Sequence, residues 1–484
     1  MASIAGRGPN EPTSLTTTRL SACLVDSHDF SCTNIGMTGP SDAPKILIIV
    51  QNLPVPLDRR VWLECQALRD SGFDVSVICP QGPGDPKRHD VDGVALYKYA
   101  PAPEAEGLAG FAYEFAYSWI RTALLSLAVR REKGFDVIQA CNPPDTYWLL
   151  GLLWKTRGVR FVFDHHDLNP ELFLSRFGAP TTPLQHAELT VLRWLERCTF
   201  RTADHVISTN ESFKKIAMER GGVAEEDVTV VRSGPDTRSM YPTRPDPEVR
   251  GDGSHLLAYL GIMGPQDGVE SVLHLMEELV HARGRTSVRA VLLGFGDSLE
   301  SLRDQCTQLG LDDYVTFTGR VGPTEIAKYL SAADVGLGPD PATPMNDLST
   351  MNKTMEYMAF GLPSVAFDLK ETRISGENSV LYVPPGDIGA FADAVERLLD
   401  DDELRAEMAV SGRRRAVSVL DWRPQRTAYL QAIQSVVSKR SLGTGEPAGE
   451  EVANELGVPT DDQSALATEE ELRSAVRRRG FAGA

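Results

Sequence analysis

Short apolar runs alternate with helical stretches along most of this chain, and that alternation limits the fold more than any other feature. The first cycle is an apolar run at Lys45–Val50, a helical stretch at Arg59–Ser71 that stops at Gly72, and a second run at Asp74–Cys79. Apolar runs of this kind are typical of strands buried on both faces, and strands joined through helices pair in parallel. The chain is therefore predicted to be an α/β protein with doubly wound parallel sheets.

The same cycle repeats before and after a polar, proline-rich segment at 236–253. Before it, further strands are expected at 136–140, 160–163 and 204–208; after it, at 256–260, 289–293, 315–317 and 335–337. Two Rossmann-like domains of this kind bind ligands in the cleft between the carboxyl ends of their strands. The predicted organisation is a disordered tail at 1–43, an N-terminal domain at 44–235, a linker at 236–253, a C-terminal domain with a return helix at 254–437, and an acidic mobile tail at 438–484.

Charge and cysteine usage argue against several kinds of protein. A formal charge of −18 leaves no basic excess for neutralising the phosphates of a nucleic acid. The seven cysteines are scattered and form no Cys-x-x-Cys pair, which favours buried thiols in a reducing compartment over disulfides or a zinc site. The N-terminus lacks the apolar core of a signal peptide, so secretion is not expected.

The stretch Leu108–Val129 is apolar and aromatic enough to raise the question of a membrane span. Glu114 and Arg121 interrupt it, and charges near the middle of a span are costly. A helix packed on the sheet is the favoured interpretation. A helix that touches a membrane surface through its aromatic face is the alternative.

A short helix followed by a turn and a strand is the best candidate for a phosphate site. The helix begins at Asn352 and ends at Gly361, and either Ser349 or Thr350 can cap it. The free N–H groups and the dipole of a helix N-terminus suit phosphate, and Lys353 adds a cation in the first turn. Glu356 lies where it could accept hydrogen bonds from sugar hydroxyls. The alternative is an ordinary strand-helix-strand unit with surface charges.

Four separated motifs resemble those of the family-4 (group 1) retaining glycosyltransferases of GT-B fold. They are Val231–Asp236, Leu293–Asp297, Gly319–Val321 and Glu356–Pro363, in the order found in that family, and the resemblance runs from residue 44 to residue 437. It implies a metal-independent enzyme without a cofactor that moves a sugar from a nucleoside diphosphate sugar to a glycan or lipid-linked acceptor. The N-terminal domain would lie on the acceptor side, and the C-terminal domain would bind the donor.

The resemblance also implies roles for individual residues. Glu356 would bind the ribose hydroxyls of the donor, and Lys353 would bind its diphosphate. His166, in preference to His165, would contact the transferred sugar near the anomeric carbon, and Asp167 would orient nearby groups. The catalytic candidates are therefore His166, Asp167 and Glu356. The other donor-binding candidates are Gly294, Gly296, Arg320, Asp347, Ser349, Thr350 and Asn352, with Arg373 in reserve.

Two pairs of residues are candidates for the acceptor side. Arg59 and Arg60 begin a helix near the predicted cleft and could hold an anionic acceptor such as a lipid phosphate; exposed arginines without that role are the alternative. Asn142 and Asp145 follow another strand, at a turn made rigid by two prolines. For Asp145, capping of the next helix is the favoured alternative to substrate contact.

The chain departs from the family pattern in ways that bear on the donor. The first of the two glutamates of the family's motif would fall on Leu348, and Asp347 or Asn346 is the candidate to replace it. The loop at 261–268 has neither the Arg nor the Lys that often clamps the diphosphate in that family. Such charge-assisted bonds contribute about 1.5–3 kcal/mol each. Lys353 and the backbone around Ser349–Asn352 would have to compensate.

No metal site is predicted, because the Asp-x-Asp patterns at 90–92 and 400–402 should be solvated. A nicotinamide-dependent oxidoreductase is disfavoured, since no Gly-x-Gly-x-x-Gly turn follows the first strand. Two alternatives stay open: a nucleotide-sugar 2-epimerase of the same fold, and a non-catalytic GT-B homologue acting as a binding subunit. The expected location is cytoplasmic, with peripheral contact at the inner membrane face left open.

Overall fold

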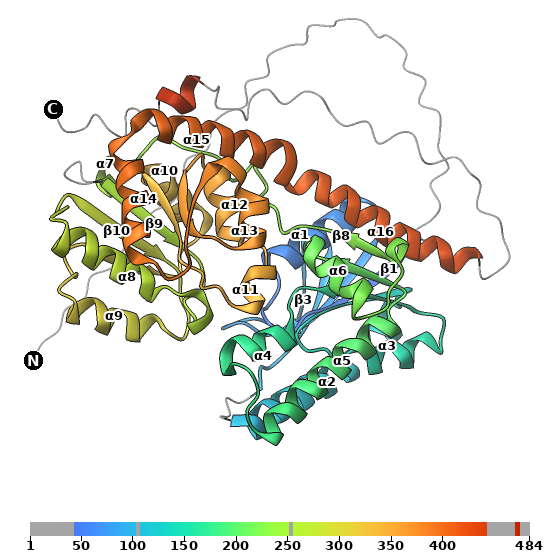
Figure 1. Ribbon diagram of the computed structural model, residues 1–484. Coiled ribbons are helices and arrows are strands. Elements are labelled where there is room, and N and C mark those ends of the chain that lie inside the picture. The colour runs from blue at the N-terminus through green and yellow to red at the C-terminus, as the bar shows by residue number, and fades with distance from the viewer. Residues whose placement is uncertain (1–42, 103–106, 251–254, 443–469, 475–484) are drawn as a thin grey trace, which may run out of the picture. The chain divides into compact units, whose positions relative to one another are not determined.

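The computed structural model describes residues 43–102, 107–250, 255–442 and 470–474. The predicted tail at 1–43 and most of the predicted acidic tail at 438–484 lie outside these residues. The domain boundaries given above stay predictions. The fold class is confirmed: the described chain forms two α/β domains, each built on its own sheet (Figure 1).

The first sheet has eight strands in the order β3-β4-β2-β1-β5-β6-β7-β8. All neighbouring pairs are parallel except β3 and β4, which form an antiparallel hairpin at one edge that the sequence did not predict. In the centre, Ile48 of β1 lies opposite both Val77 and Gln139. The strands are β1 (Lys45–Ile49), β2 (Asp74–Pro80), β3 (Arg88–Val91), β4 (Val94–Tyr99), β5 (Val137–Cys141), β6 (Arg160–His165), β7 (His205–Ser208) and β8 (Val228–Val230).

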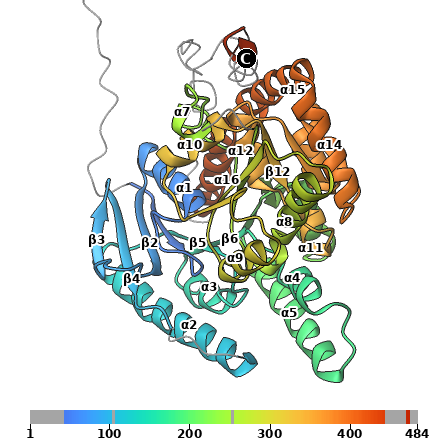
Figure 2. The same ribbon diagram turned by 90° about the vertical axis from the view of Figure 1, so that its left-hand side faces the viewer.

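Helices cover both faces of the first sheet. Figure 2 shows α2 and α3 along one side of its strands and α1 on the other. Three helices contribute to one core cluster: α2 through Val129, α3 through Trp154 and α5 through Phe200. The helices are α1 (Arg59–Asp70), α2 (Gly107–Glu132), α3 (Trp148–Lys155), α4 (Asn169–Phe177), α5 (Pro183–Thr202) and α6 (Glu211–Glu219).

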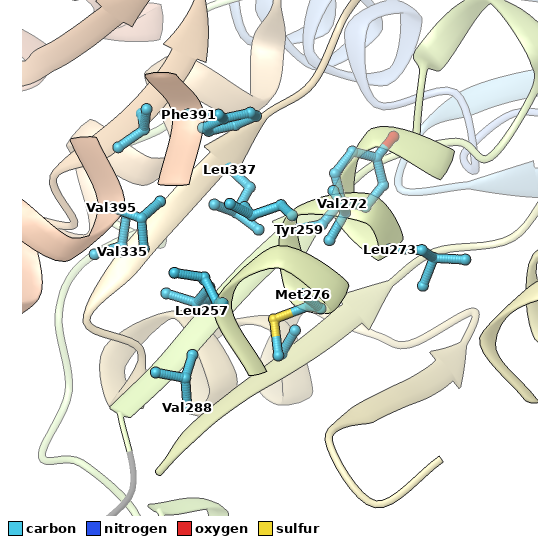
Figure 3. Packing of buried hydrophobic residues seen from close by; sticks show 14 of the residues in the cluster. Leu257, Tyr259, Val272, Leu273, Met276, Val288, Val335, Leu337, Phe391 and Val395 are labelled. Atoms are coloured by element: carbon cyan, nitrogen blue, oxygen red, sulfur yellow. The ribbon is translucent and has the colours of Figure 1, made fainter. Parts of the chain in front are cut away.

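The second sheet has six strands, all parallel, in the order β11-β10-β9-β12-β13-β14. Its core lies between the sheet and α8 and α14, where Tyr259, Met276, Leu337 and Phe391 pack together (Figure 3). Such aliphatic and aromatic burial is the main stabilising term of a domain of this kind. The strands are β9 (His255–Leu260), β10 (Val288–Leu293), β11 (Val315–Gly319), β12 (Val335–Gly338), β13 (Ser364–Phe367) and β14 (Val380–Val383).

The helices of the second half include two short ones near β12. They are α11 (Pro344–Leu348) and α12 (Asn352–Ala359), and both bear candidate site residues. The others are α7 (Pro247–Arg250), α8 (Glu270–Glu277), α9 (Leu299–Gln308), α10 (Pro323–Ala332), α13 (Lys370–Gly376), α14 (Ile388–Asp400), α15 (Asp402–Arg415) and α16 (Trp422–Leu442).

The last long helix returns to the first sheet. Trp422, Tyr429 and Ile433 of α16 are buried in the same core cluster as Val61 and Leu68 of α1. The face of the first sheet that α1 covers is therefore completed by residues from the far end of the sequence.

The apolar stretch at Leu108–Val129 lies within α2, which packs on β2 and β4. Its buried side includes Ser118, Thr122 and Val129. None of the helices in the described part of the chain, α2 included, has both the length and the apolarity needed to cross a bilayer. The packed helix, which the sequence favoured, is the one observed.

Candidate functional site

The α12 helix begins at the carboxyl end of the second sheet, after β12 and α11. Its N-cap residue is Met351, and no side chain caps it. The expected cap by Ser349 or Thr350 is wrong, because the Thr350 hydroxyl instead accepts a bond of 3.0 Å from Asn210 Nδ2 of the first half. Without a side-chain cap, the first-turn N–H groups stay available for a ligand.

Lys353, in the first turn of α12, is buried rather than solvated. Its ammonium group forms an ion pair with Asp340, and Nζ lies 5.2 Å from the centre of the Tyr259 ring. Burial would lower the pKa of Lys353, but the attraction of Asp340 and Asp267 outweighs burial and raises it. Lys353 is therefore charged at neutral pH, and its charge already has a counterion.

The Lys353 side chain also reaches the loop that lacks a cation of its own. A Cβ atom added to Gly261 would lie 3.2 Å from Lys353 Cε. A positive charge is thus present beside the 261–268 loop, supplied by α12. Asp267, in the same loop, is a second acid that attracts the Lys353 ammonium group. Burial raises the pKa of Asp267.

Glu356 follows one turn later and faces the first half of the chain. Its carboxylate accepts a hydrogen bond from Arg59 Nη1, and its side chain is only 11% exposed. Arg59 stands at the start of α1, so a predicted acceptor-side residue pairs with a predicted donor-binding one. Whether Arg59 also holds an anionic acceptor stays a prediction.

Two glycine-containing loops pack backbone to backbone beside Lys353. Gly261 N donates to Leu293 O at 3.0 Å, and Met263 N donates to Phe295 O at 2.9 Å. A Cβ on Gly294 would lie 1.8 Å from the carbonyl oxygen of Gly261, so this contact requires glycine. The loops after β9 and β10 thereby form one surface beside α12, and the Arg320 guanidinium stacks on Phe295 at its edge.

The other donor-binding candidates lie on the segment between β12 and α12. The Asp347 carboxylate accepts from the Lys370 backbone N–H at 2.9 Å. Asn346 is buried and donates to the carbonyl of Gln266 at 2.9 Å, which ties α11 to the 261–268 loop. Ser349 N donates to Asn346 O, and Asn352 is exposed. The structure therefore gives Asp347 and Asn346 internal partners, and their role toward a sugar stays a prediction.

The two histidines at the end of β6 have different surroundings. His165 is fully buried among Phe163, Phe200 and Phe213, and burial lowers its pKa to about 3. His166 is half-buried, with its ring beside Arg60 and Asp164. The ring of His166 is therefore the more accessible of the two, and its contact with a sugar stays a prediction.

Asn142 and Asp145 organise the loop that carries His166 and Asp167. Asn142 Oδ1 accepts from the backbone N–H of His166 at 2.7 Å and of Asp167 at 3.1 Å. Asp145 accepts from Asn142 Nδ2 at 3.0 Å and from Asn169 Nδ2 at 2.6 Å. It does not cap α3, whose N-cap is Tyr147, so the capping alternative is wrong. Burial raises the pKa of Asp145 to about 6 despite these bonds, and it also raises the pKa of Asp167.

A buried group of charged residues behind His166 was not predicted. It comprises Glu64, Gln139 and Asp164 together with Arg60, and all four are buried or nearly so. Glu64 could have been found in the sequence, because it stands among the apolar positions Val61, Cys65 and Leu68 on the buried side of α1. An acid on such a face needs a buried partner, and Arg60 lies one turn before it.

Within the part of the chain that the structure describes, one trio of ligand-type atoms lies close enough to hold a metal ion, formed by Cys141, Asp164 and His166. The guanidinium group of Arg60 already contacts two of the three, at 3.0 Å each. A bound cation would be repelled by that charge, so these residues do not fit a metal site. The Asp-x-Asp patterns serve local structure: Asp90 binds Gly93 N in the β3–β4 turn, and Asp401 caps α15.

Two family models match the chain. The "Glycosyl transferase 4-like domain" matches residues 57–234, and "Glycosyl transferases group 1" matches residues 254–401. The chain belongs to the group 1 glycosyltransferases. The two matches fall on the two sheet-bearing halves and include His166, Lys353 and Glu356.

Curated relatives of this glycosyltransferase align over much of their length. It is 26% identical to an alpha-D-kanosaminyltransferase of Streptomyces kanamyceticus over 60% of this chain and 76% of the relative. It is 25% identical to a D-inositol 3-phosphate glycosyltransferase of Kineococcus radiotolerans over 85% of this chain and 95% of the relative. The epimerase and non-catalytic alternatives are not favoured by these relatives.

Solved structures place the glycosyltransferase in the GT-B fold. A sucrose-phosphate synthase from Thermosynechococcus elongatus superposes with a TM-score of 0.65 at 19% identity. The superposition covers 83% of this chain and 100% of the synthase chain. The Anabaena protein HepE in complex with UDP superposes with a TM-score of 0.59 at 17% identity, covering 82% and 100%. At these identities the likeness concerns the fold.

Proposed function

We propose that this glycosyltransferase moves a sugar from a nucleoside diphosphate sugar to a glycan or lipid-linked acceptor, with retention at the anomeric carbon and without a metal ion or other cofactor. The observation that carries the proposal is the arrangement on α12. An uncapped helix N-terminus and a charged Lys353 lie beside the paired loops at 261–264 and 294–296, and one turn on the Glu356 carboxylate faces the first half of the chain.

The chemistry of transfer explains why these groups belong together. As the glycosidic bond of the donor breaks, negative charge gathers on the departing diphosphate and positive charge on the sugar. Backbone N–H groups at a helix N-terminus and a fixed ammonium group stabilise that developing anion without reorganising. Glu356 would accept hydrogen bonds from the ribose hydroxyls, and donor binding would release it from Arg59.

The relatives support the donor class without naming the sugar. One printed name gives a kanosaminyl group as what is transferred, another gives D-inositol 3-phosphate, and the HepE structure contains UDP. The site of this chain differs from the family pattern at Leu348 and in the 261–268 loop. Lys353, which lies against that loop, is the residue we assign to the task of the missing cations.

We also propose that the first half of this glycosyltransferase contacts the surface of a membrane. Large apolar side chains stay exposed on neighbouring helices of the first half: Tyr113, Phe115, Ile120, Leu124 and Leu127 on α2, Leu149, Leu152 and Leu153 on α3, and Val191 and Trp194 on α5. The exposed arginines Arg157, Arg193 and Arg197 lie on or beside these helices, although the whole chain carries a charge of −18. Apolar side chains bordered by arginines suit the surface of an anionic bilayer.

The donor proposal is tested by a panel of nucleoside diphosphate sugars, with mass analysis of products formed on sugar and lipid acceptors. Lys353→Ala is expected to lower kcat about 10²–10³-fold, the cost of losing one preorganised donor to a developing anion. Lys215→Ala, which alters an exposed lysine on α6, is the control. Near wild-type turnover in Lys353→Ala would remove Lys353 from the mechanism, and product formation without any acceptor would favour an epimerase.

Membrane contact is tested by flotation with vesicles. Binding to vesicles containing phosphatidylglycerol, and little to phosphatidylcholine vesicles, is expected. The double variant Leu152→Glu with Leu153→Glu should lose binding, whereas Val419→Glu, at an exposed apolar position outside these helices, should keep it. Equal binding by both variants would contradict the assignment of this surface.

A further inference from the structure

Behind His166, five side chains from four elements form a buried polar cluster. Arg60 and Glu64 come from α1, Gln139 from β5, Asp164 from β6 and Tyr429 from α16. Buried polar groups must be paired to be tolerated, and these are paired mainly with one another. The cluster lies directly against the ring of His166, so its arrangement decides what that ring can offer to a substrate.

Arg60 is held by a partner on each side of its guanidinium group. Nη1 donates to the carbonyl oxygen of Val231 at 2.7 Å and to the hydroxyl of Ser233 at 3.1 Å. Nη2 donates to Asp164 Oδ1 at 3.0 Å. With its side chain 9% exposed, Arg60 has little freedom to move. Its remaining group, Nε–H, is thereby aimed at His166 Nε2 at 3.0 Å.

This contact constrains the protonation of the histidine ring. A guanidinium nitrogen only donates, so His166 Nε2 must accept, and in a neutral ring the proton then sits on Nδ1. The opposite tautomer would donate from Nε2 to Asp164 Oδ2, which lies 2.9 Å away. That oxygen, however, already accepts from Gln139 Nε2 at 2.8 Å and has the Cys141 thiol within 3.7 Å.

The charges of the cluster balance around Arg60. Gln139 Nε2 donates at 2.8 Å to Glu64 Oε2 and also to Asp164 Oδ2, so the two carboxyl groups are neighbours. Burial and the adjacent Asp164 raise the pKa of Glu64 well above its ordinary value. Burial would also raise the pKa of Asp164, but the attraction of the Arg60 guanidinium opposes burial, and the pKa is lowered instead. Asp164 therefore pairs with Arg60 as an anion, and the raised pKa of Glu64 favours its protonated form, although Glu64 Oε1 also lies 3.1 Å from Arg60 Nε.

We propose that Arg60 is a positioning residue that holds His166 with its proton on Nδ1, so that the ring presents an N–H donor to an oxygen of the transferred sugar. The inference rests on the proposed function for the identity of the sugar, but the form of the ring does not depend on turnover. Asp164 holds Arg60 in place, and Gln139 and Tyr429 hold Asp164 and its neighbour Glu64. This assigns Arg60 a role inside the protein, in place of contact with an anionic acceptor.

The decisive measurement is the ¹⁵N NMR spectrum of the full chain labelled selectively in histidine, recorded at a pH where the ring is neutral. The His166 signals are identified by their loss in His166→Gln. A protonated-type shift at Nδ1 and an unprotonated-type shift at Nε2 are expected. Arg60→Gln should abolish this preference. A proton on Nε2 in the wild-type chain would overturn the proposal, whether or not any donor has been found.

A second arm measures turnover with the donor found in the panel above. Asp164→Asn removes the counterion of Arg60 and is expected to lower kcat about 10²-fold, the scale of a misplaced reacting group, with donor KM within about twofold. Asp334→Asn is the matched control, because Asp334 is an equally buried partner of an arginine in the second domain. It should lower Tm without changing kcat. A loss of kcat in Asp334→Asn equal to that in Asp164→Asn would reduce the Asp164 effect to one of stability and overturn the positioning role.

Discussion

Lys353 and Asp340 form an ion pair in which neither side chain is more than 8% exposed. Asp340 follows β12, and Lys353 is the only lysine of α12, so the pair joins the end of a strand to the helix assigned to the donor. Removing two charges from water is costly unless each has a close partner. The pair keeps Lys353 charged and in place, but it also puts an acid where an anionic ligand must compete for the lysine.

Asp340→Asn tests that competition. The change keeps the shape of the side chain and removes its charge, so a nucleoside diphosphate is expected to bind about tenfold more tightly, equivalent to about 1.4 kcal/mol. Because Lys353 loses its buried partner, the free energy of unfolding should fall by about 3 kcal/mol. Calorimetric titration and urea denaturation measure the two effects. Weaker binding would mean that Asp340 chiefly orients Lys353.

Stability should depend on pH through Glu196. Burial raises its pKa from 4.5 to about 7, even though its carboxylate accepts from Arg220 at 2.6 Å. The folded state therefore binds a proton that the unfolded state releases, so stability is highest below about pH 4.5 for this group and declines as the pH rises to about 7. The decline amounts to about 3 kcal/mol.

Glu196→Gln isolates this contribution from those of other groups. The variant should lose less stability than the wild type between pH 5 and pH 8, measured by urea denaturation at each pH (about 1.4 kcal/mol corresponds to each unit of pKa shift). Arg220 keeps its two bonds to Glu171 in the variant. Parallel pH profiles of the two proteins would show that Glu196 is not the titrating group.

Gly294→Ala should disturb the joined loops after β9 and β10. The added Cβ would lie 1.8 Å from the Gly261 carbonyl oxygen, and neither atom belongs to a flexible side chain. A loss of about 3 kcal/mol in the free energy of unfolding is expected, together with loss of donor binding. Gly322→Ala is the control, because a Cβ there meets nothing within 4 Å. Equal stability of the two variants would contradict the tight contact.

Tyr429→Phe should weaken the attachment of α16. The hydroxyl donates to Gln139 Oε1 at 2.7 Å, and its removal leaves a buried acceptor without that partner. A loss of about 1–3 kcal/mol is expected in urea denaturation. Tyr241→Phe, at an exposed position, should be neutral. A neutral result for Tyr429→Phe would mean that apolar packing alone holds the helix.

The sequence was sufficient for the architecture because the strands and helices have local signals. The runs at 45–50 and 74–79 became β1 and β2, and Gly361 ends the turn after α12 with a φ of +58°. The β3–β4 hairpin was missed because its short edge strand, β3, is mostly polar and no residue of it is buried. The cap of α12 was misassigned because Thr350 binds Asn210, which is distant in sequence.

The site could be predicted only to the level of individual residues. Lys353, Glu356 and His166 stand in recognisable motifs, but their partners do not. Arg59 and Glu356 are 297 positions apart, and Tyr429 and Gln139 are 290 apart. Nothing in one sequence links such pairs, because the links arise from tertiary packing. These partners determine which charged side chains are free to bind a ligand, and only the structure identifies the partners.

The return of α16 to the first sheet has a consequence for synthesis of the chain. Trp422, Tyr429 and Ile433 complete a core whose other members begin at Ile46. During translation one apolar face of the first domain therefore stays uncovered until nearly all of the second domain has left the ribosome. Domains made N-terminus first are exposed to misassembly in such an interval. A chain stopped after residue 421 would leave that face without its cover.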